Sequence, residues 1–190
     1  ELDKELIIGH LKDFIAGGYV STNWWHNDIG LPLTITPTMF LCEDFLPKEI
    51  MQGLIKYIGN GSLRIHPEIV NEKNEYHRGA NLIHYCTVSI RHGIFTGDYD
   101  EVKSAITAME EETYGSRLGL QSDGSFFQHG RRLYSLGYGL GYLKELINIL
   151  HQIKNSAFDF SYEAKENIVK HTLDGIRHMV GGTGFDYTPS

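Results

Sequence analysis

Apolar residues recur along most of this chain at the spacing of an amphipathic helix. In the first segment Leu11, Phe14 and Ile15 continue an i, i+3, i+4 pattern, and Gly17 ends the run. The same pattern predicts about seven helices, joined by loops. They cover approximately residues 6–15, 32–42, 47–58, 80–95, 98–112, 137–153 and 162–179.

Local signals indicate where these helices begin and end. Pro47 suits the first turn of its helix, and Gly97 suits the end of the long apolar helix before it. Either Asp98 or Asp100 is expected to cap the next helix. Residues 114–130 are glycine-rich and irregular, with a strand at most over residues 125–128. More apolar helices alternate with more charged ones, which favours an all-α array of antiparallel pairs over a simple four-helix bundle.

Composition narrows the function. The chain of 190 residues is one domain or a large piece of one, and its net charge of −7 argues against a nucleic-acid surface. No apolar run approaches the roughly 20 residues of a membrane span. Cys42 and Cys86 lie in apolar runs and are expected to be buried free thiols. No signal segment opens the chain, and both ends look like cuts within a longer protein.

The most informative stretch runs from Gly124 to Gly139. His129, Tyr134 and Tyr138 lie there among glycines, just before an apolar helical run. A loop that leads into a helix N-terminus gathers free backbone N–H groups and a partial positive charge. Those are conditions under which a tyrosine can act as a base and an anion can be held beside it.

Three blocks of the sequence together resemble one family. They are Asn23-Trp24-Trp25-His26-Asn27-Asp28-Ile29-Gly30-Leu31-Pro32, Gly79-Ala80-Asn81-Leu82, and Asp123-Gly124-Ser125-Phe126-Phe127-Gln128-His129-Gly130 with Tyr138-Gly139. In their order and rough spacing they closely resemble polysaccharide lyase family 8, which includes hyaluronate, chondroitin AC and xanthan lyases. The resemblance implies that residues 1–190 are part of a catalytic domain, an incomplete α/α toroid. The family's β-sandwich domains would then lie outside this chain.

The resemblance also implies a reaction, β-elimination at a uronic acid, without a cofactor. Asn81 and His129 correspond to the family residues that handle the uronate carboxylate, and Tyr138 corresponds to the tyrosine that moves the protons. An amide donates to a carboxylate without losing a proton, and histidine can donate or accept near neutral pH. Family members add an arginine soon after the segment that matches Phe185-Asp186-Tyr187, and a later glutamate. These 190 residues are therefore expected to hold only part of the active site.

Other residues in or beside the matching blocks are candidates for substrate binding. They are Asn23, Trp24, Trp25, Gln128, Arg131 and Tyr134. Trp24 and Trp25 are either a stacking platform for sugar rings or core aromatics. Asn81 is alternatively a helix cap, His129 a loop histidine bonded to backbone, and Tyr134 a rival to Tyr138 for the catalytic hydroxyl.

The remaining charged and imidazole groups leave several alternatives open. Arg131 and Arg132 either guide an anionic chain or are simply solvated. Histidines at positions 77, 84, 171 and 178 lack partners at ligand spacing, so we expect packing or surface roles and no metal site.

Two hypotheses follow. The first is a secreted or periplasmic lyase that cuts an acidic polysaccharide such as hyaluronan or chondroitin. The second is a carbohydrate-binding α/α module without catalytic activity. Neither nucleic acid nor membrane is an expected partner. A toroid cut open would also expose apolar helix surface, so we predict an apolar edge over residues 168–179 and self-association through it.

Overall fold

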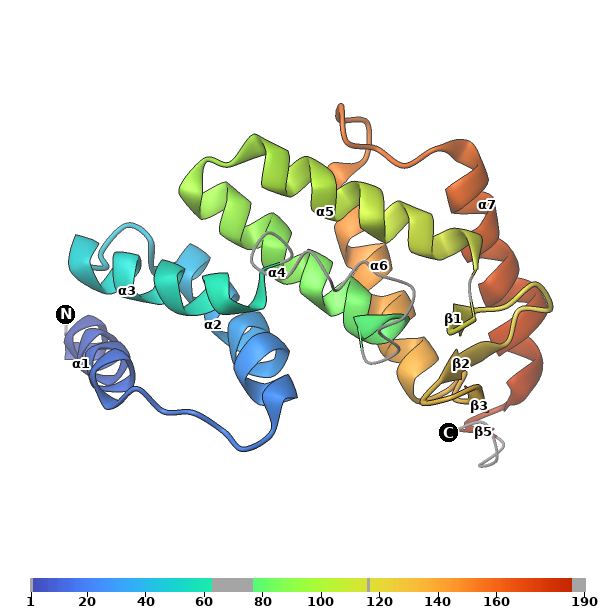
Figure 1. Cartoon of the computed structure of the whole chain (residues 1–190), viewed down its shortest axis with the longest axis horizontal. Coiled ribbons are helices and arrows are strands. Elements are labelled where there is room, and N and C mark those ends of the chain that lie inside the picture. The colour runs from blue at the N-terminus through green and yellow to red at the C-terminus, as the bar shows by residue number, and fades with distance from the viewer. Residues whose placement is uncertain (1, 63–76, 116, 186–190) are drawn as a thin grey trace.

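The structure, a computed structural model, describes residues 2–62, 77–115 and 117–185 and is built mainly of helices (Figure 1). The predicted all-α class is confirmed, and the predicted helices are present with ends shifted by a few residues. Their bounds are α1 Leu2–Gly17, α2 Leu31–Cys42, α3 Lys48–Ile58, α4 Ala80–Thr96, α5 Tyr99–Glu111, α6 Tyr138–Ile153 and α7 Tyr162–Lys170.

Helix α4 is the central element. It packs against α2 and α3, which precede it in the chain, and against α5 and α6, which follow it (Figure 1). Nearly all of its residues from Ala80 to Ile90 are buried, as its mainly apolar sequence predicts. One core cluster joins α4, α5, α6 and α7, and a second joins α2 and α3 with the inner face of α1. Cys42 and Cys86 are buried free thiols, as expected.

The helix boundaries have local causes. Gly97 ends α4 in the left-handed region at φ 70°, which glycine adopts without a Cβ penalty. Asp98 then caps α5, because its Oδ1 accepts the Glu101 backbone N–H at 3.0 Å. Pro47 lies one position earlier than predicted, since it is the residue preceding α3 rather than part of the first turn. Of the two predicted caps for α5, the structure uses Asp98.

Short helical segments of other pitch extend several helices. A π-helix, His26–Gly30, leads into α2, and 3₁₀ turns follow α3 at Gly59–Gly61 and α5 at Glu112–Tyr114. The single helix predicted over residues 162–179 is wrong in this detail, because α7 continues as a π-helix, His171–Gly175, and a 3₁₀ turn, Ile176–Met179. A close approach restricts this segment, because a Cβ on Gly175 would lie 2.0 Å from the Gly124 carbonyl oxygen.

Residues 117–133 contain more regular structure than the sequence predicted. Strands β1 Gly119–Leu120, β2 Phe126–Gln128 and β3 Arg132–Leu133 form an antiparallel sheet in that order. A second pair is formed by β4 Val180–Gly181 and β5 Gly184–Phe185. Only β2 was anticipated, because strands of two residues are too short to show alternation.

The predicted apolar edge over residues 168–179 is only partly exposed. Ile168 and Ile176 are buried, whereas Val169 and Leu173 are nearly half exposed. Self-association stays a prediction, which sedimentation at high protein concentration would check. No helix in the described ranges is long and apolar enough to cross a membrane.

Candidate active site

His129 lies on a tight hairpin that the sheet holds in place. Strands β2 and β3 pair Gln128 with Arg132, so three residues make the connection. All three have positive φ, with His129 at 52°, Gly130 at 74° and Arg131 at 69°. Non-glycine residues rarely adopt this conformation, and such outliers often occur at functional sites. The conformation leaves His129 exposed at the tip of the hairpin.

Tyr134 and Tyr138 flank the turn that follows β3. Tyr138 is the first residue of α6, and the Tyr134 carbonyl oxygen accepts the Gly139 N–H at 2.9 Å. A Cβ on Gly139 would lie 3.0 Å from the Cβ of Phe126, so a glycine lets α6 start directly against β2. The turn therefore brings both phenol rings beside the hairpin.

These three side chains form one aromatic cluster. His129 Nε2 lies 2.8 Å from the Tyr138 hydroxyl oxygen, within hydrogen-bond distance. The ring centroids are 5.0 Å apart for His129 and Tyr138, 5.3 Å for Tyr134 and Tyr138, and 6.1 Å for His129 and Tyr134, each pair edge to face. Either the phenol donates to a neutral imidazole or an imidazolium donates to the phenol oxygen, so a proton can pass between the two groups.

A groove of about 280 Å³ opens beside this cluster. Its walls come from the first two turns of α4 and the start of α6. The lining residues are Ala80, His84, Tyr134, Gly137, Tyr138 and Gly141. The groove is thus formed by segments fifty or more residues apart in sequence, and Tyr138, the partner of His129, is part of its wall.

His84 is the groove residue that the sequence reasoning missed. It was expected to be a packing or surface histidine, yet it lines the groove with the two tyrosines. Burial lowers the pKa of His84 to about 4, so its imidazole is neutral at pH 7. One signal could have found it: His84 lies three residues after Asn81, on the same helix face.

Asn81 is only 3% exposed and lies in the first turn of α4. Gly79 occupies the N-cap position, so the alternative that Asn81 caps this helix is wrong. Ala80 and His84, which line the groove, lie directly before Asn81 and one turn after it. That the Asn81 amide reaches the same groove as Tyr138 stays a prediction.

The two tryptophans have different environments. Trp24 is 36% exposed and lies parallel to the Tyr85 ring, with centroids 6.4 Å apart. Trp25 packs against the core and against Gly30, and its ring meets the edge of His84 at 6.4 Å. Exposure suits Trp24 for stacking on a sugar, whereas Trp25 supports the groove wall through His84.

The other predicted binding residues also differ in how exposed they are. Arg131 is exposed on the hairpin tip, where it is free to meet a ligand. Asn23 is exposed, and its Oδ1 accepts the Trp25 backbone N–H at 3.0 Å. Gln128 has no exposed surface, and its amide contacts the backbone at the start of α4. Because a fully buried side chain offers a polymer nothing to contact, the structure does not support substrate binding by Gln128.

A buried carboxylate close to the site was not predicted either. Burial raises the pKa of Glu112 to about 7, although the Arg78 guanidinium and the Gly79 N–H both act to lower it. Arg78 Nη2 lies 2.9 Å from Glu112 Oε2. In residues 2–62, 77–115 and 117–185, no three His, Cys, Asp or Glu side chains gather as ligands for a metal ion.

Comparison with known proteins shows which proteins the chain resembles. The chain is 25% identical over 190 residues to hyaluronate lyase HylA of Cutibacterium acnes, and 27% identical over 176 residues to hyaluronate lyase of Staphylococcus aureus. These alignments cover 92% and 87% of the chain but only 23% and 22% of the relatives. The chain thus spans about a quarter of the length of the proteins it matches.

Solved structures share the fold. A chondroitinase AC lyase superimposes with a TM-score of 0.85 at 19% identity, and the match covers 98% of this chain and 27% of that one. The Streptomyces coelicolor chondroitin AC lyase gives the same TM-score, 0.85, at 18% identity over 96% of this chain and 25% of that one. Residues 8–182 match the family profile described as polysaccharide lyase family 8, N terminal alpha-helical domain. The chain therefore belongs to polysaccharide lyase family 8.

Proposed function

We propose that the protein carrying this chain is a lyase that cleaves an acidic, uronate-containing polysaccharide by β-elimination. The observation that carries the proposal is the 2.8 Å contact between His129 and Tyr138 beside a groove lined by aromatic rings. The family membership and the hyaluronate and chondroitin lyases among its relatives support it.

The chemistry assigns tasks to three groups, Tyr138, Asn81 and His129. Tyr138 removes the proton from C5 of the uronate, the C4–C5 double bond forms, and the bond from C4 to the leaving oxygen breaks. Tyr138, which now carries the C5 proton, donates a proton to that oxygen. Asn81 and His129 bind the uronate carboxylate and offset its negative charge, which makes the C5 proton acidic enough to remove. The His129–Tyr138 contact lets the phenol proton pass to His129, so that Tyr138 can act as the base.

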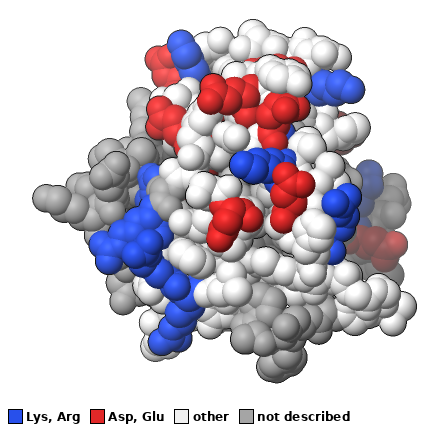
Figure 2. Space-filling view, turned by 90° about the vertical axis from the view of Figure 1, so that its right-hand side faces the viewer, with Lys and Arg blue, Asp and Glu red and all other residues white. Residues whose placement is uncertain are grey.

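The surface charge near the hairpin suits an anionic substrate. The net charge of the chain is −7, yet Arg131 and Arg132 are both exposed beside His129. Figure 2 shows a group of basic side chains along the left-hand edge of that end of the molecule, while acidic side chains, with some basic ones among them, lie over its upper part and centre. A local group of cations can attract an anionic chain despite an acidic whole. Substrates of this kind are extracellular, so we propose a secreted or periplasmic location.

The test is incubation of the full-length protein with hyaluronan, chondroitin and xanthan. A lyase creates an unsaturated uronide, whose enol ether absorbs in the ultraviolet, so absorbance rises with time. Binding of one polymer without any rise in absorbance would contradict the proposal and favour the carbohydrate-binding module. Comparing the three polymers also identifies the substrate class.

A further inference from the structure

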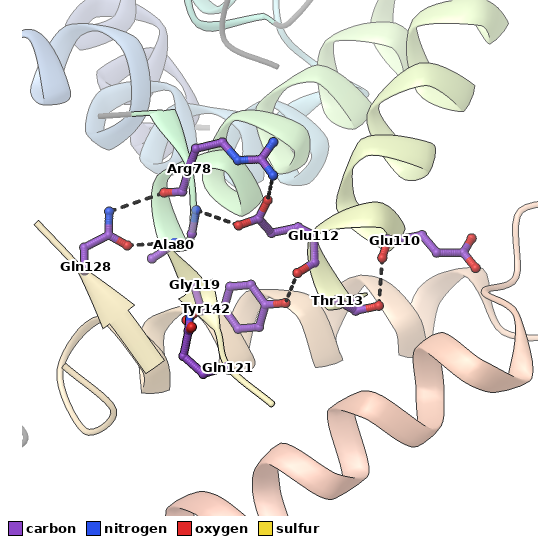
Figure 3. A network of polar contacts seen from close by, with 10 residues as sticks. Arg78, Ala80, Glu110, Glu112, Thr113, Gly119, Gln121, Gln128 and Tyr142 are labelled. Carbon is purple, nitrogen blue, oxygen red and sulfur yellow. Dashed lines mark hydrogen bonds and ion pairs between the residues drawn. The ribbon is translucent and has the colours of Figure 1, made fainter. Parts of the chain in front are cut away.

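The first turn of α4 is held by side chains from two distant segments. Glu112 Oε1 accepts the Gly79 N–H at 2.9 Å, and Gln128 Oε1 accepts the Ala80 N–H at 3.3 Å (Figure 3). Gln128 Nε2 also donates to the Arg78 carbonyl oxygen at 3.3 Å. A helix start leaves several N–H groups without partners, and a local Ser, Thr, Asp or Asn usually meets one of them. Here the cap position is Gly79, which has no side chain, and the acceptors come from 33 and 48 residues away.

The backbone is shaped to admit these acceptors. Gly79 and Gly119 both have positive φ, at 62° and 81°. A Cβ on Gly79 would lie 2.4 Å from Gln128 Oε1, and one on Gly119 would lie 2.8 Å from Glu112 Oε1. Any side chain at either glycine would therefore displace one of the two buried acceptors.

Glu112 also connects helix α6 to the start of α4. Its backbone oxygen accepts the Tyr142 hydroxyl at 3.5 Å, and its carboxylate pairs with Arg78 at 2.9 Å (Figure 3). The carboxylate also lies at the N-terminus of α4, where the helix dipole favours its ionised form. The network thus joins the end of α5, the start of α4, strand β2 and helix α6 inside the molecule.

Three residues of this network, Ala80, Gln128 and Tyr142, lie close in sequence to the three proposed catalytic residues. Asn81 follows Ala80 directly, His129 follows Gln128 directly, and Tyr138 lies one helical turn before Tyr142. We propose that Glu112 and Gln128 are positioning residues, which hold Asn81, His129 and Tyr138 in a fixed mutual arrangement. This inference rests on the proposed function for its catalytic consequence. It also changes the role assigned to Gln128, from substrate binding to holding the start of α4 in place.

Substitutions can separate the two contacts of the Glu112 side chain, the ion pair with Arg78 and the hydrogen bond from the Gly79 N–H. Glu112→Gln removes the charge but keeps an oxygen that can accept the Gly79 N–H, whereas Glu112→Ala removes both. Gln128→Met keeps the volume and removes the amide. Glu111→Gln is the matched control, because Glu111 is the exposed neighbour on the same turn. Circular dichroism of the full-length proteins first shows which variants are folded.

Hydrogen–deuterium exchange of the full-length protein measures the positioning itself. We expect Glu112→Ala and Gln128→Met to speed exchange in two segments at once, residues 79–84 and 126–133, with Glu112→Gln between them and wild type. The Glu111→Gln control should match wild type. Faster exchange only near the substituted residue would overturn the proposal. If Glu112→Ala does not fold, Glu112→Gln and Gln128→Met carry the same test.

Kinetics on the same proteins measure the consequence. We expect kcat to fall about 10- to 100-fold in Glu112→Ala and Gln128→Met while KM changes less than about twofold, because misplaced groups affect the transition state most. Glu112→Gln should recover part of the loss. Unchanged kcat in an active enzyme would refute the positioning role and leave the lyase assignment intact. If wild type shows no lyase activity, the proposed function fails, and the exchange pattern alone decides whether the network couples the two segments.

Discussion

Replacing Glu112 by glutamine should change how the stability of the protein depends on pH. Glu112 is almost completely buried, and burial raises the pKa of its carboxyl from 4.5 to about 7. Between those two values the unfolded chain carries an ionised carboxylate, while the folded chain keeps the proton. The favourable contribution of Glu112 is therefore fully present below about pH 4.5 and is lost as the pH rises through about 7.

The size of the effect follows from the two pKa values. A difference of about 2.5 between 4.5 and about 7 corresponds to about 3 kcal/mol of unfolding free energy. Arg78, Cys86 and Tyr142 are the titratable groups facing Glu112. Burial, and then the Glu112 charge, raise the pKa of both the Cys86 thiol and the Tyr142 phenol, so neither titrates over this range.

His84 contributes a change of the opposite sign. Burial lowers its pKa from 6.5 to about 4, so its contribution to stability is present above about pH 6.5 and is lost as the pH falls through about 4. The wild-type curve adds these effects to those of other shifted groups such as His171, whose pKa burial also lowers. Only the difference between wild type and variant isolates Glu112.

The assay is urea denaturation of wild type, Glu112→Gln and the control Glu111→Gln at several pH values, followed by circular dichroism. From about pH 4.5 to about pH 8, the stability of Glu112→Gln relative to wild type should rise by about 3 kcal/mol. Glu111→Gln should track wild type, because that carboxylate is exposed. A difference between Glu112→Gln and wild type that stays constant with pH would refute the reasoning.

Further predictions concern the groove and the tight contacts. Trp24→Ala should weaken polymer binding by about 1–3 kcal/mol in calorimetry, with little loss of stability, because its ring is exposed. Trp25→Ala should also lower the unfolding free energy by about 2–4 kcal/mol, because its ring packs against the core. Equal effects of the two changes on stability would contradict this. Gly175→Ala should destabilise the protein by about 1–3 kcal/mol or more in thermal denaturation, since its Cβ would lie 2.0 Å from the Gly124 oxygen. Gly9→Ala is the control, because nothing lies within 4 Å of its Cβ, and it should be neutral or stabilising.

The helices could be predicted because their signals are local. Gly97 and Asp98 act on residues within one turn, so the sequence alone shows where α4 ends and α5 begins. The cap of α4 could not be predicted in this way. Its acceptors lie 33 and 48 residues away, and Gly79 itself gives no hint of them. Strands β1 and β3 were missed for a related reason, since two residues carry no pattern of their own.

In the candidate site, too, some residues could be predicted from the sequence and others could not. The resemblance to the family pointed to His129 and Tyr138, and the structure places these two side chains in contact. The roles of Gln128 and His84 could not be assigned from sequence, because they depend on which way each side chain faces once β2 and α4 are packed. A buried amide and a groove-lining imidazole look alike in a linear motif.

The central claim is that the Tyr138 hydroxyl carries the proton in a β-elimination. The most direct measurement compares wild type and Tyr138→Phe of the full-length protein by the rate of ultraviolet absorbance increase on its polysaccharide, together with polymer affinity. The account predicts a loss of at least about 10²–10⁴-fold in turnover with nearly unchanged affinity, because only one oxygen is removed. Tyr134→Phe tests the rival hydroxyl and should keep most of the activity. Near-normal uronide release by Tyr138→Phe would contradict the account and turn attention to Tyr134 or His129.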